Sequence, residues 1–96
     1  MEPAERSEEA CFSLGRVVMT RAAQAALQQH EIATAIARHA RGDWGELCAE
    51  DAAANEHALE GDGRLLSVYR AADGSKFWVI TEADRSATTV LLPEDY

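Results

Sequence analysis

The sequence predicts a small α+β domain in which three short helices are followed by a three-stranded antiparallel β-meander. Apolar residues recur at helical spacing between about residues 20 and 60, and the pattern changes to β-branched and aromatic runs from Arg64 onward. The 96 residues suit one domain, and much of the 47% hydrophobic fraction is alanine. We therefore expect a small core with close Ala-lined helix contacts.

The start of the chain is predicted to form a flexible acidic tail over residues 1–10, ahead of a single domain over residues 11–96. The tail holds four glutamates and almost nothing to bury. The run CFSLGRVVM follows, and the pattern favours either an edge strand or a lead-in segment. Because the sequence shows no signal peptide and no apolar run of about 18 residues, we expect a cytoplasmic protein without a membrane segment.

Two helices are expected next. Thr20 is the predicted N-cap of the short Ala-rich helix RAAQAALQQ. In the second helix, Ile32, Ile36 and Ala40 recur every four residues and form one apolar face. Gly42 stands where a C′ glycine ends a helix. The short break between the two helices predicts a tight αα corner.

A third helix is predicted over about residues 46–59, after a turn in which Asp43 is expected to cap it. The glycine-rich stretch EGDG ends this helix. Trp44 is expected to pack in an apolar slot between helices. The predicted buried stripe consists of Leu47, Cys48, Ala52, Asn55 and Leu59.

Three strands complete the prediction. RLLSVYRA and KFWVITEA are separated by ADGS, a hairpin signal built on Asp73-Gly74, and ATTVLL follows the short turn DRS. Trp78 and Ile80 alternate on one strand, so we expect both to face the helices and Trp78 to be mostly buried. Large apolar residues also occur at the intervening positions, which indicates a sheet face that helices do not fully cover.

The net charge of −8 is distributed unevenly along the chain. Residues 1–10 carry −3, residues 11–41 carry +3, residues 42–63 carry −7 and residues 64–96 carry −1. Proteins hold nucleic acid chiefly through Lys and Arg, whereas an acidic field attracts basic surfaces. The charge therefore predicts a basic protein partner, and it argues against direct nucleic-acid binding.

The acidic block is the predicted partner-binding surface. On a helix over residues 46–59, Glu46 and Glu50 are one turn apart, as are Glu56 and Glu60, and like charges at this spacing repel. Such a pattern indicates tertiary partners (Arg38, Arg41 or Arg64), an external basic partner, or a face that serves only solubility. The seven predicted residues are Asp43, Glu46, Glu50, Asp51, Glu56, Glu60 and Asp62.

Motifs for metal or cofactor chemistry are not found in the sequence. The histidines and cysteines match no HExxH or CxxC spacing, and no glycine-rich phosphate loop precedes a helix. We therefore predict no metal, no cofactor and no catalytic residue, so the protein is expected not to be an enzyme. The residues considered were His30, His39, His57, Cys11 and Cys48.

Two alternatives remain open. A small hydrolase would use Glu82, Asp84 and Arg85 near a strand end, since paired carboxylates serve hydrolysis. A structural or oligomerising module would instead form a homodimer through exposed apolar residues of the meander. The residues proposed for that dimer face are Leu65, Tyr69 and Phe77.

Three stretches of the chain resemble a family of small bacterial proteins from plasmids, integrative elements and some phages. They are ARHARGDWGELCAEDAAANEHAL, GRLLSVYR and KFWVITEADRSATTVLLPEDY. The family is usually labelled plasmid-related, and the resemblance covers about residues 12–96. It brings no catalytic residues, and the type I restriction subunit label that some members carry does not fit so short a chain. The resemblance implies a mobile genetic element, a setting in which anti-defence proteins are frequent. In that setting the small acidic chain is compatible with an anti-CRISPR or anti-restriction protein. The carboxylates spaced along the predicted helix suggest a DNA mimic that binds a basic host or element-encoded protein.

Overall fold

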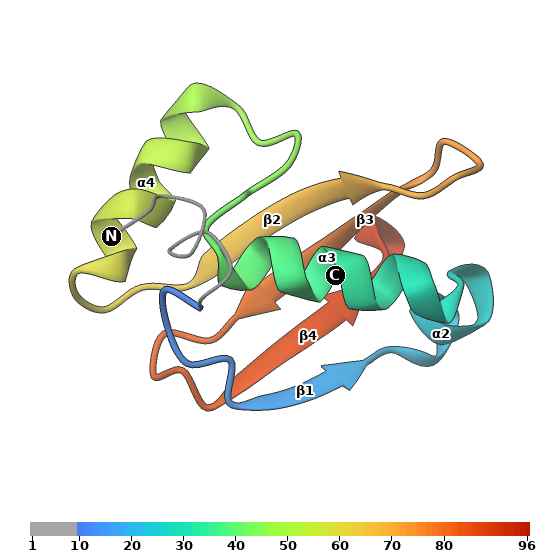
Figure 1. The fold of residues 1–96 in the computed structure, drawn as a ribbon, viewed down its shortest axis with the longest axis horizontal. Coiled ribbons are helices and arrows are strands. Elements are labelled where there is room, and N and C mark those ends of the chain that lie inside the picture. The colour runs from blue at the N-terminus through green and yellow to red at the C-terminus, as the bar shows by residue number, and fades with distance from the viewer. Residues whose placement is uncertain (1–9) are drawn as a thin grey trace, which may run out of the picture.

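The computed structural model describes residues 10–96 and shows an α+β fold built on a four-stranded mixed sheet (Figure 1). The strand order is β1-β4-β3-β2, with β1 parallel to β4 and the other neighbours antiparallel. The elements in chain order are β1 (Arg16–Met19), α2 (Arg21–Ala26), α3 (Gln29–Ala40), α4 (Ala49–Leu59), β2 (Leu65–Arg70), β3 (Lys76–Thr81), β4 (Ala87–Leu91) and the 3₁₀ turn η1 (Pro93–Asp95).

The prediction of a three-stranded antiparallel meander after all the helices is wrong. Strands β2 to β4 do form an antiparallel meander, but β1 precedes the helices and pairs in parallel with β4, with Arg16 opposite Ala87. A parallel pair needs a long crossover, and here the whole helical segment and the β2–β3 hairpin lie between the two strands. A four-residue strand gives no sequence signal for so distant a partner.

Gly15 explains how β1 enters the sheet. Its φ is 64°, and a Cβ at this position would collide with the carbonyl oxygen of Arg85. Glycine alone combines the left-handed conformation with so close an approach of two backbones. The Arg16 N–H then donates to the Ser86 carbonyl at 3.0 Å and starts the parallel ladder.

Both predicted caps of the first two helices are confirmed. The Thr20 hydroxyl accepts from the Ala23 N–H at 3.1 Å, so that Thr20 is the N-cap of α2. Gly42 has a φ of 83° directly after the C-cap of α3, as a C′ glycine should.

The third helix is shorter than predicted, and Asp43 does not cap it. It begins at Ala49, after Cys48 at the N-cap, because the segment before it runs along the edge of β2. There the Glu46 N–H donates to the Val68 carbonyl at 2.7 Å, and the Val68 N–H donates to the Trp44 carbonyl at 3.1 Å. The predicted stripe is partly right: Asn55 is buried, Leu47, Ala52 and Leu59 are half-buried, and Cys48 is exposed.

The core forms two clusters on the face of the sheet that α3 covers. The larger lies between α2, α3 and the sheet, and the smaller packs α4 against the start of β2. Trp44 is 7% exposed within the smaller cluster, which confirms the prediction for this tryptophan. The larger cluster contains Ala23, Leu27, Ile32, Ala35, Tyr69, Ala71, Phe77, Val79 and Val90, and the smaller contains Trp44, Ala58 and Leu65.

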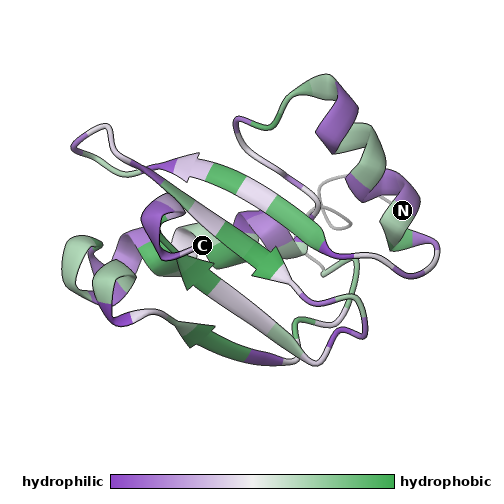
Figure 2. Cartoon of the chain, turned by 180° about the vertical axis from the view of Figure 1, so that it is seen from behind, coloured by the Kyte–Doolittle hydropathy of each residue, from purple (hydrophilic) through white to green (hydrophobic). Residues whose placement is uncertain are grey.

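The predicted orientation of the strands is wrong by one residue. Phe77 and Val79 face the helices, so Trp78 and Ile80 lie on the opposite face, where Trp78 is half-buried against Tyr96. Because side chains alternate along a strand, a shift of one residue exchanges the two faces. The dimer face proposed at Leu65, Tyr69 and Phe77 is wrong for the same reason, since all three are buried. Figure 2 views the sheet from the side that α3 leaves open, with hydrophobic residues along its strands.

Candidate partner-binding surface

Helix α4 carries much of the acidic block and lies over the start of β2, to one side of α3 (Figure 1). Asn55 attaches it to the sheet through both polar atoms of its amide. Its Nδ2 donates to the Leu66 carbonyl at 2.6 Å, and its Oδ1 accepts from the Leu66 N–H at 3.2 Å. Asn55 is buried, so this pair replaces the solvation of two backbone groups.

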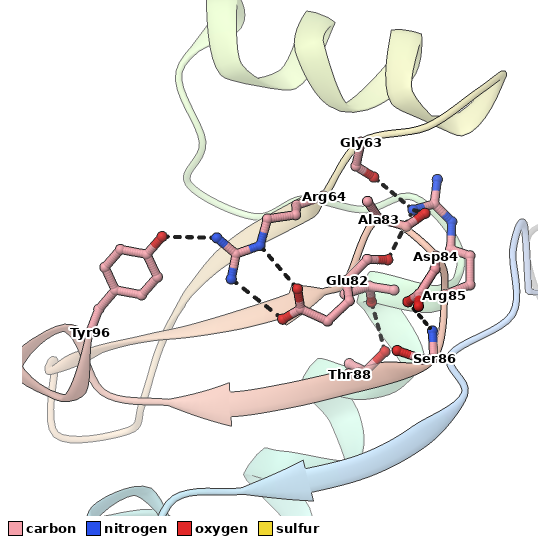
Figure 3. Close-up of polar contacts among 10 residues, drawn as sticks. Gly63, Arg64, Glu82, Ala83, Asp84, Arg85, Ser86, Thr88 and Tyr96 are labelled. Atoms are coloured by element: carbon pink, nitrogen blue, oxygen red, sulfur yellow. Dashed lines mark hydrogen bonds and ion pairs between the residues drawn. The ribbon is translucent and has the colours of Figure 1, made fainter.

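The C-terminal end of α4 is held by Arg85, which lies in the turn between β3 and β4. Its guanidinium donates to the carbonyls of Ala58 at 2.8 Å and Gly63 at 2.7 Å, and Figure 3 shows the contact with Gly63. Arg85 has a φ of 61°, a conformation that L residues other than Gly, Asn and Asp rarely adopt. The bond to Ala58 adds a donor at the last turn of α4, and the bond to Gly63 holds the segment that follows, so both fix this end of the helix in place.

Replacing Asn55 with Ala is expected to lower the free energy of unfolding by about 1–3 kcal/mol, because it leaves the Leu66 N–H and carbonyl without partners. Amide hydrogen exchange should become faster throughout α4, while α3 keeps its protection. Ala54→Ser, at an exposed neighbouring position, is the control. Unchanged exchange in α4 of the Asn55→Ala variant would show that the other contacts suffice to hold the helix.

Three of the seven predicted acids have partners within the molecule. Asp43 pairs with Nε of Arg38 at 2.8 Å, and this hydrogen bond lowers the pKa of the Asp43 carboxyl below its usual value. The arginines expected to neutralise the glutamates pair elsewhere: Arg38 pairs with Asp43, and Arg64 pairs with Glu82.

The other two engaged acids lie on either side of the turn that leads into α4. Glu46 precedes the helix and pairs with Nε of Arg70 at 3.0 Å, which lowers the pKa of the Glu46 carboxyl. Glu56 accepts a hydrogen bond from Nε1 of Trp44 at 2.9 Å. The predicted repulsion between Glu46 and Glu50 on one helix therefore does not arise, since Glu46 is not helical.

The remaining four acids are exposed, and within residues 10–96 their side chains have no ion pair or hydrogen bond. Glu50 and Asp51 lie in the first turn of α4, where the positive end of the helix dipole favours them. Glu60 is the C-cap and Asp62 follows in the turn, at the end where the dipole disfavours acids. At about 1.5 Å per residue, Glu50 and Glu60 stand about 15 Å apart along the helix axis.

The alternative catalytic trio does not converge on a common space. Glu82 faces Arg64, with Oε1 3.3 Å from its Nε, while Asp84 accepts from the Ser86 N–H at 3.0 Å (Figure 3). Arg85 extends to the other side of the turn, toward the carbonyls at the end of α4. Asp84 therefore shapes the turn, Arg85 supports the end of α4, and Glu82 pairs with the residue that precedes β2.

His39 is the one histidine in the interior of the described domain. Its Nδ1 lies 2.6 Å from the Ser67 hydroxyl and its Nε2 lies 2.9 Å from that of Thr81. The chain of hydroxyls continues through Thr88, which donates to the Leu14 carbonyl at 2.7 Å. Burial lowers the pKa of His39 to about 4, so the imidazole is neutral at pH 7. The sequence placed this histidine near a helix end but gave no sign of its hydroxyl partners.

No metal centre is formed by the described side chains. Between residues 10 and 96, no group of three His, Cys, Asp or Glu side chains is placed to hold an ion. Cys11 and Cys48 are free and exposed, and the Cys11 thiol donates to the Arg41 carbonyl at 3.4 Å. The part of the chain that the structure describes also contains no helix with the length and hydropathy required to cross a bilayer.

Comparison of the chain with family models, with curated proteins and with solved structures gives no match.

Proposed function

We propose that this chain is a non-catalytic interaction protein that offers the acidic surface around α4 to a basic protein partner. One observation carries the proposal: Glu50, Asp51, Glu60 and Asp62 are exposed and have no internal counter-charge among the described residues, although nine basic residues are present in the chain. They lie at the two ends of α4, a helix that Asn55 and the neighbouring turn hold in place.

The charge of this surface favours binding to a basic protein and gives no support to catalysis. Exposed carboxylates that are not neutralised act over about 8 Å at physiological salt and raise the rate of encounter with a basic surface. A rigid support adds to this, because little conformational entropy is lost when the partner binds. The net charge of −8 acts in the same direction.

The partner we propose is a basic, nucleic-acid-handling protein of the bacterial cytoplasm. Such a protein presents Lys and Arg to phosphates, and a fixed set of carboxylates occupies the same cations. The resemblance to proteins of mobile elements supports an anti-CRISPR or anti-restriction role. Duplex DNA is then expected to compete with the chain for its partner.

The oligomerising alternative is favoured by one observation, the apolar sheet face that α3 leaves open. A groove of about 290 Å³ on this face is lined by Arg64, Leu66, Trp78, Ile80 and Tyr96. Light scattering during size exclusion separates the two proposals, because an interaction protein of this kind needs no dimer. A stable dimer that Trp78→Lys dissociates would favour the oligomerising module.

The test of the acidic surface is isosteric neutralisation. The variant Glu50→Gln/Asp51→Asn/Glu60→Gln/Asp62→Asn keeps side-chain shape and changes the charge from −8 to −4. We expect it to fold, because exposed substitutions usually change stability by less than about 0.5 kcal/mol each. It should capture at least about tenfold less of the basic partner that the parent chain retains from bacterial extract, with the association rate losing its salt dependence.

A matched control removes the same charge elsewhere. Changing Glu2, Glu5, Glu8 and Glu9 to Gln also gives −4 but keeps Glu50, Asp51, Glu60 and Asp62. This control should capture the partner as the parent does. Equal loss in both variants would mean that net charge alone matters, and equal retention would mean that the α4 surface is not the binding site.

A further inference from the structure

Strand β1 presents a free edge of the sheet. The N–H groups of Arg16 and Thr20 donate to the carbonyls of Ser86 and Val90 of the β4 segment, each at 3.0 Å. Because successive residues of a strand point their backbone groups to opposite sides, those of Val17 and Met19 are directed outward. In the described part of the chain no strand pairs with that side. At the other end of the sheet, by contrast, the segment around Gly45 covers the edge of β2.

An apolar groove runs beside this free edge. Val17 is 39% exposed and Met19 is 36% exposed, and both pair across the ladder with residues that face α3. The groove has a volume of about 570 Å³, and its walls contain no charged side chain. It is lined by Met19, Gln24, Leu27, Gln29, Ile32, Ala33 and Ile36. A strand added to β1 would direct every second side chain into this groove, since paired residues share a face.

The charges around the β1 edge favour an acidic partner over a second copy of the chain. Arg16 begins β1 and Arg21 follows its end, and neither has an ion pair within residues 10–96. Among the described residues, the Asp95 carboxylate lies near the end of β1, and it already accepts from the Thr20 hydroxyl and the Leu92 N–H. A second copy of β1 would bring two further arginines to the same place, where like charges repel.

We propose that the β1 edge and the adjoining groove bind an extended segment of another protein, apolar at alternate positions and acidic at its ends. The segment adds a fifth strand to the sheet. Its backbone pairs with Val17 and Met19, its apolar side chains enter the groove below α3, and its carboxylates meet Arg16 and Arg21. This mode of binding is β-augmentation, in which main-chain bonds give affinity and the groove gives specificity. The site is separate from the acidic surface of α4.

The probe is the synthetic peptide acetyl-Glu-Thr-Val-Thr-Val-Thr-Glu-amide, titrated into the full chain and followed by NMR. At saturation the amides of Val17 and Met19 should exchange with solvent about tenfold more slowly, because each gains a hydrogen-bond acceptor. The amide of Thr20 should be protected with and without peptide, which reports an intact sheet. A peptide with Lys in place of both Glu residues should bind at least about fivefold more weakly.

Two variants test the edge and the groove separately. Val17→Pro removes one outward N–H without touching the ladder to β4, and should weaken the peptide about tenfold. Ala33→Glu places a carboxylate in the groove and should also weaken the binding of the peptide about tenfold. Thr34→Glu is the matched control, since this exposed residue lies on the other side of α3. The affinity of this variant for the peptide should stay within about twofold of that of the parent chain.

Several results would overturn the proposal. One is the absence of protection at Val17 and Met19 at millimolar peptide, and another is equal weakening by Ala33→Glu and Thr34→Glu. Self-association of the chain that protects the same two amides would assign the edge to a second copy instead. Equal binding of the lysine peptide would show that acidic ends are not required, which contradicts the acidic occupant. The neutralised α4 variant should bind the peptide as the parent does, so the two proposals fail independently.

Discussion

Replacing Trp44 with Ala is expected to lower the free energy of unfolding by about 3–5 kcal/mol. The indole is 7% exposed and fills the space between α4 and the start of β2, where it packs against Ala58 and Leu65. It also stacks on Phe12 at a centroid distance of 6.3 Å. Small domains have total stabilities of about 5–10 kcal/mol, so this loss removes a large part of the margin. Each kcal/mol corresponds to about 4–8 °C in Tm for a domain of this size.

Trp78→Ala is the matched comparison, because it deletes the same side chain from the opposite face of the sheet. Trp78 is half-buried, and its ring contact is with Tyr96 at a centroid distance of 5.6 Å. We expect a loss of about 1–2 kcal/mol, since less apolar area is returned to water. Urea unfolding of the two variants gives the comparison. Equal losses would mean that the open face contributes as much to stability as the cluster around Trp44.

The local elements were predictable because their signals are local. Thr20 and Gly42 act through hydrogen bonds and dihedral angles within a few residues, and the Asp73-Gly74 hairpin forms as its sequence predicts, with Gly74 at a φ of 92°. The parallel pairing of β1 was not predictable in this way. It depends on a close approach at Gly15 to a turn near the other end of the chain, which no periodicity reveals.

The acidic surface shows the same limit. The sequence located all seven carboxylates but not their partners, because Arg70 and Trp44 approach Glu46 and Glu56 only through the folding of the segment before α4. The like-charge pattern that suggested a functional helix is therefore partly relieved within the molecule. What remains unrelieved among the described residues is a smaller group at the two ends of α4, and it was the tertiary structure that separated this group from the rest.

Lowering the pH from 6.5 to 4 is expected to reduce the stability of the domain by about 3 kcal/mol through His39 alone. Burial lowers the pKa of His39 from 6.5 to about 4, so the unfolded chain binds a proton in this interval that the folded chain does not. The stabilisation is therefore complete above pH 6.5 and is lost as the pH falls toward 4. The slope is about 1.4 kcal/mol per pH unit.

Between pH 6.5 and 5.0, the change in the free energy of unfolding is expected to come mainly from His39. Carboxyl groups with a lowered pKa, such as Asp43 beside Arg38 and Glu46 beside Arg70, affect stability mainly below about pH 5, where unfolded carboxyl groups take up protons. Urea unfolding at pH 7.5, 6.5, 5.5 and 5.0 should show the slope in the parent chain. His39→Gln keeps hydrogen-bonding capacity toward the hydroxyls of Ser67 and Thr81 but cannot titrate, so it should unfold with nearly constant free energy between pH 6.5 and 5.0.

His57→Gln makes the same replacement at an exposed position of α4 and is the control for the substitution itself. It should change the free energy of unfolding at pH 7.5 by less than about 0.5 kcal/mol, because exposed substitutions usually have small effects. If His39→Gln instead retained the slope, the slope would arise from other groups, and burial would not be lowering the pKa of His39 in the parent chain. The imidazole would then have to reach water in spite of the burial of Ser67, Thr81 and Thr88 around it.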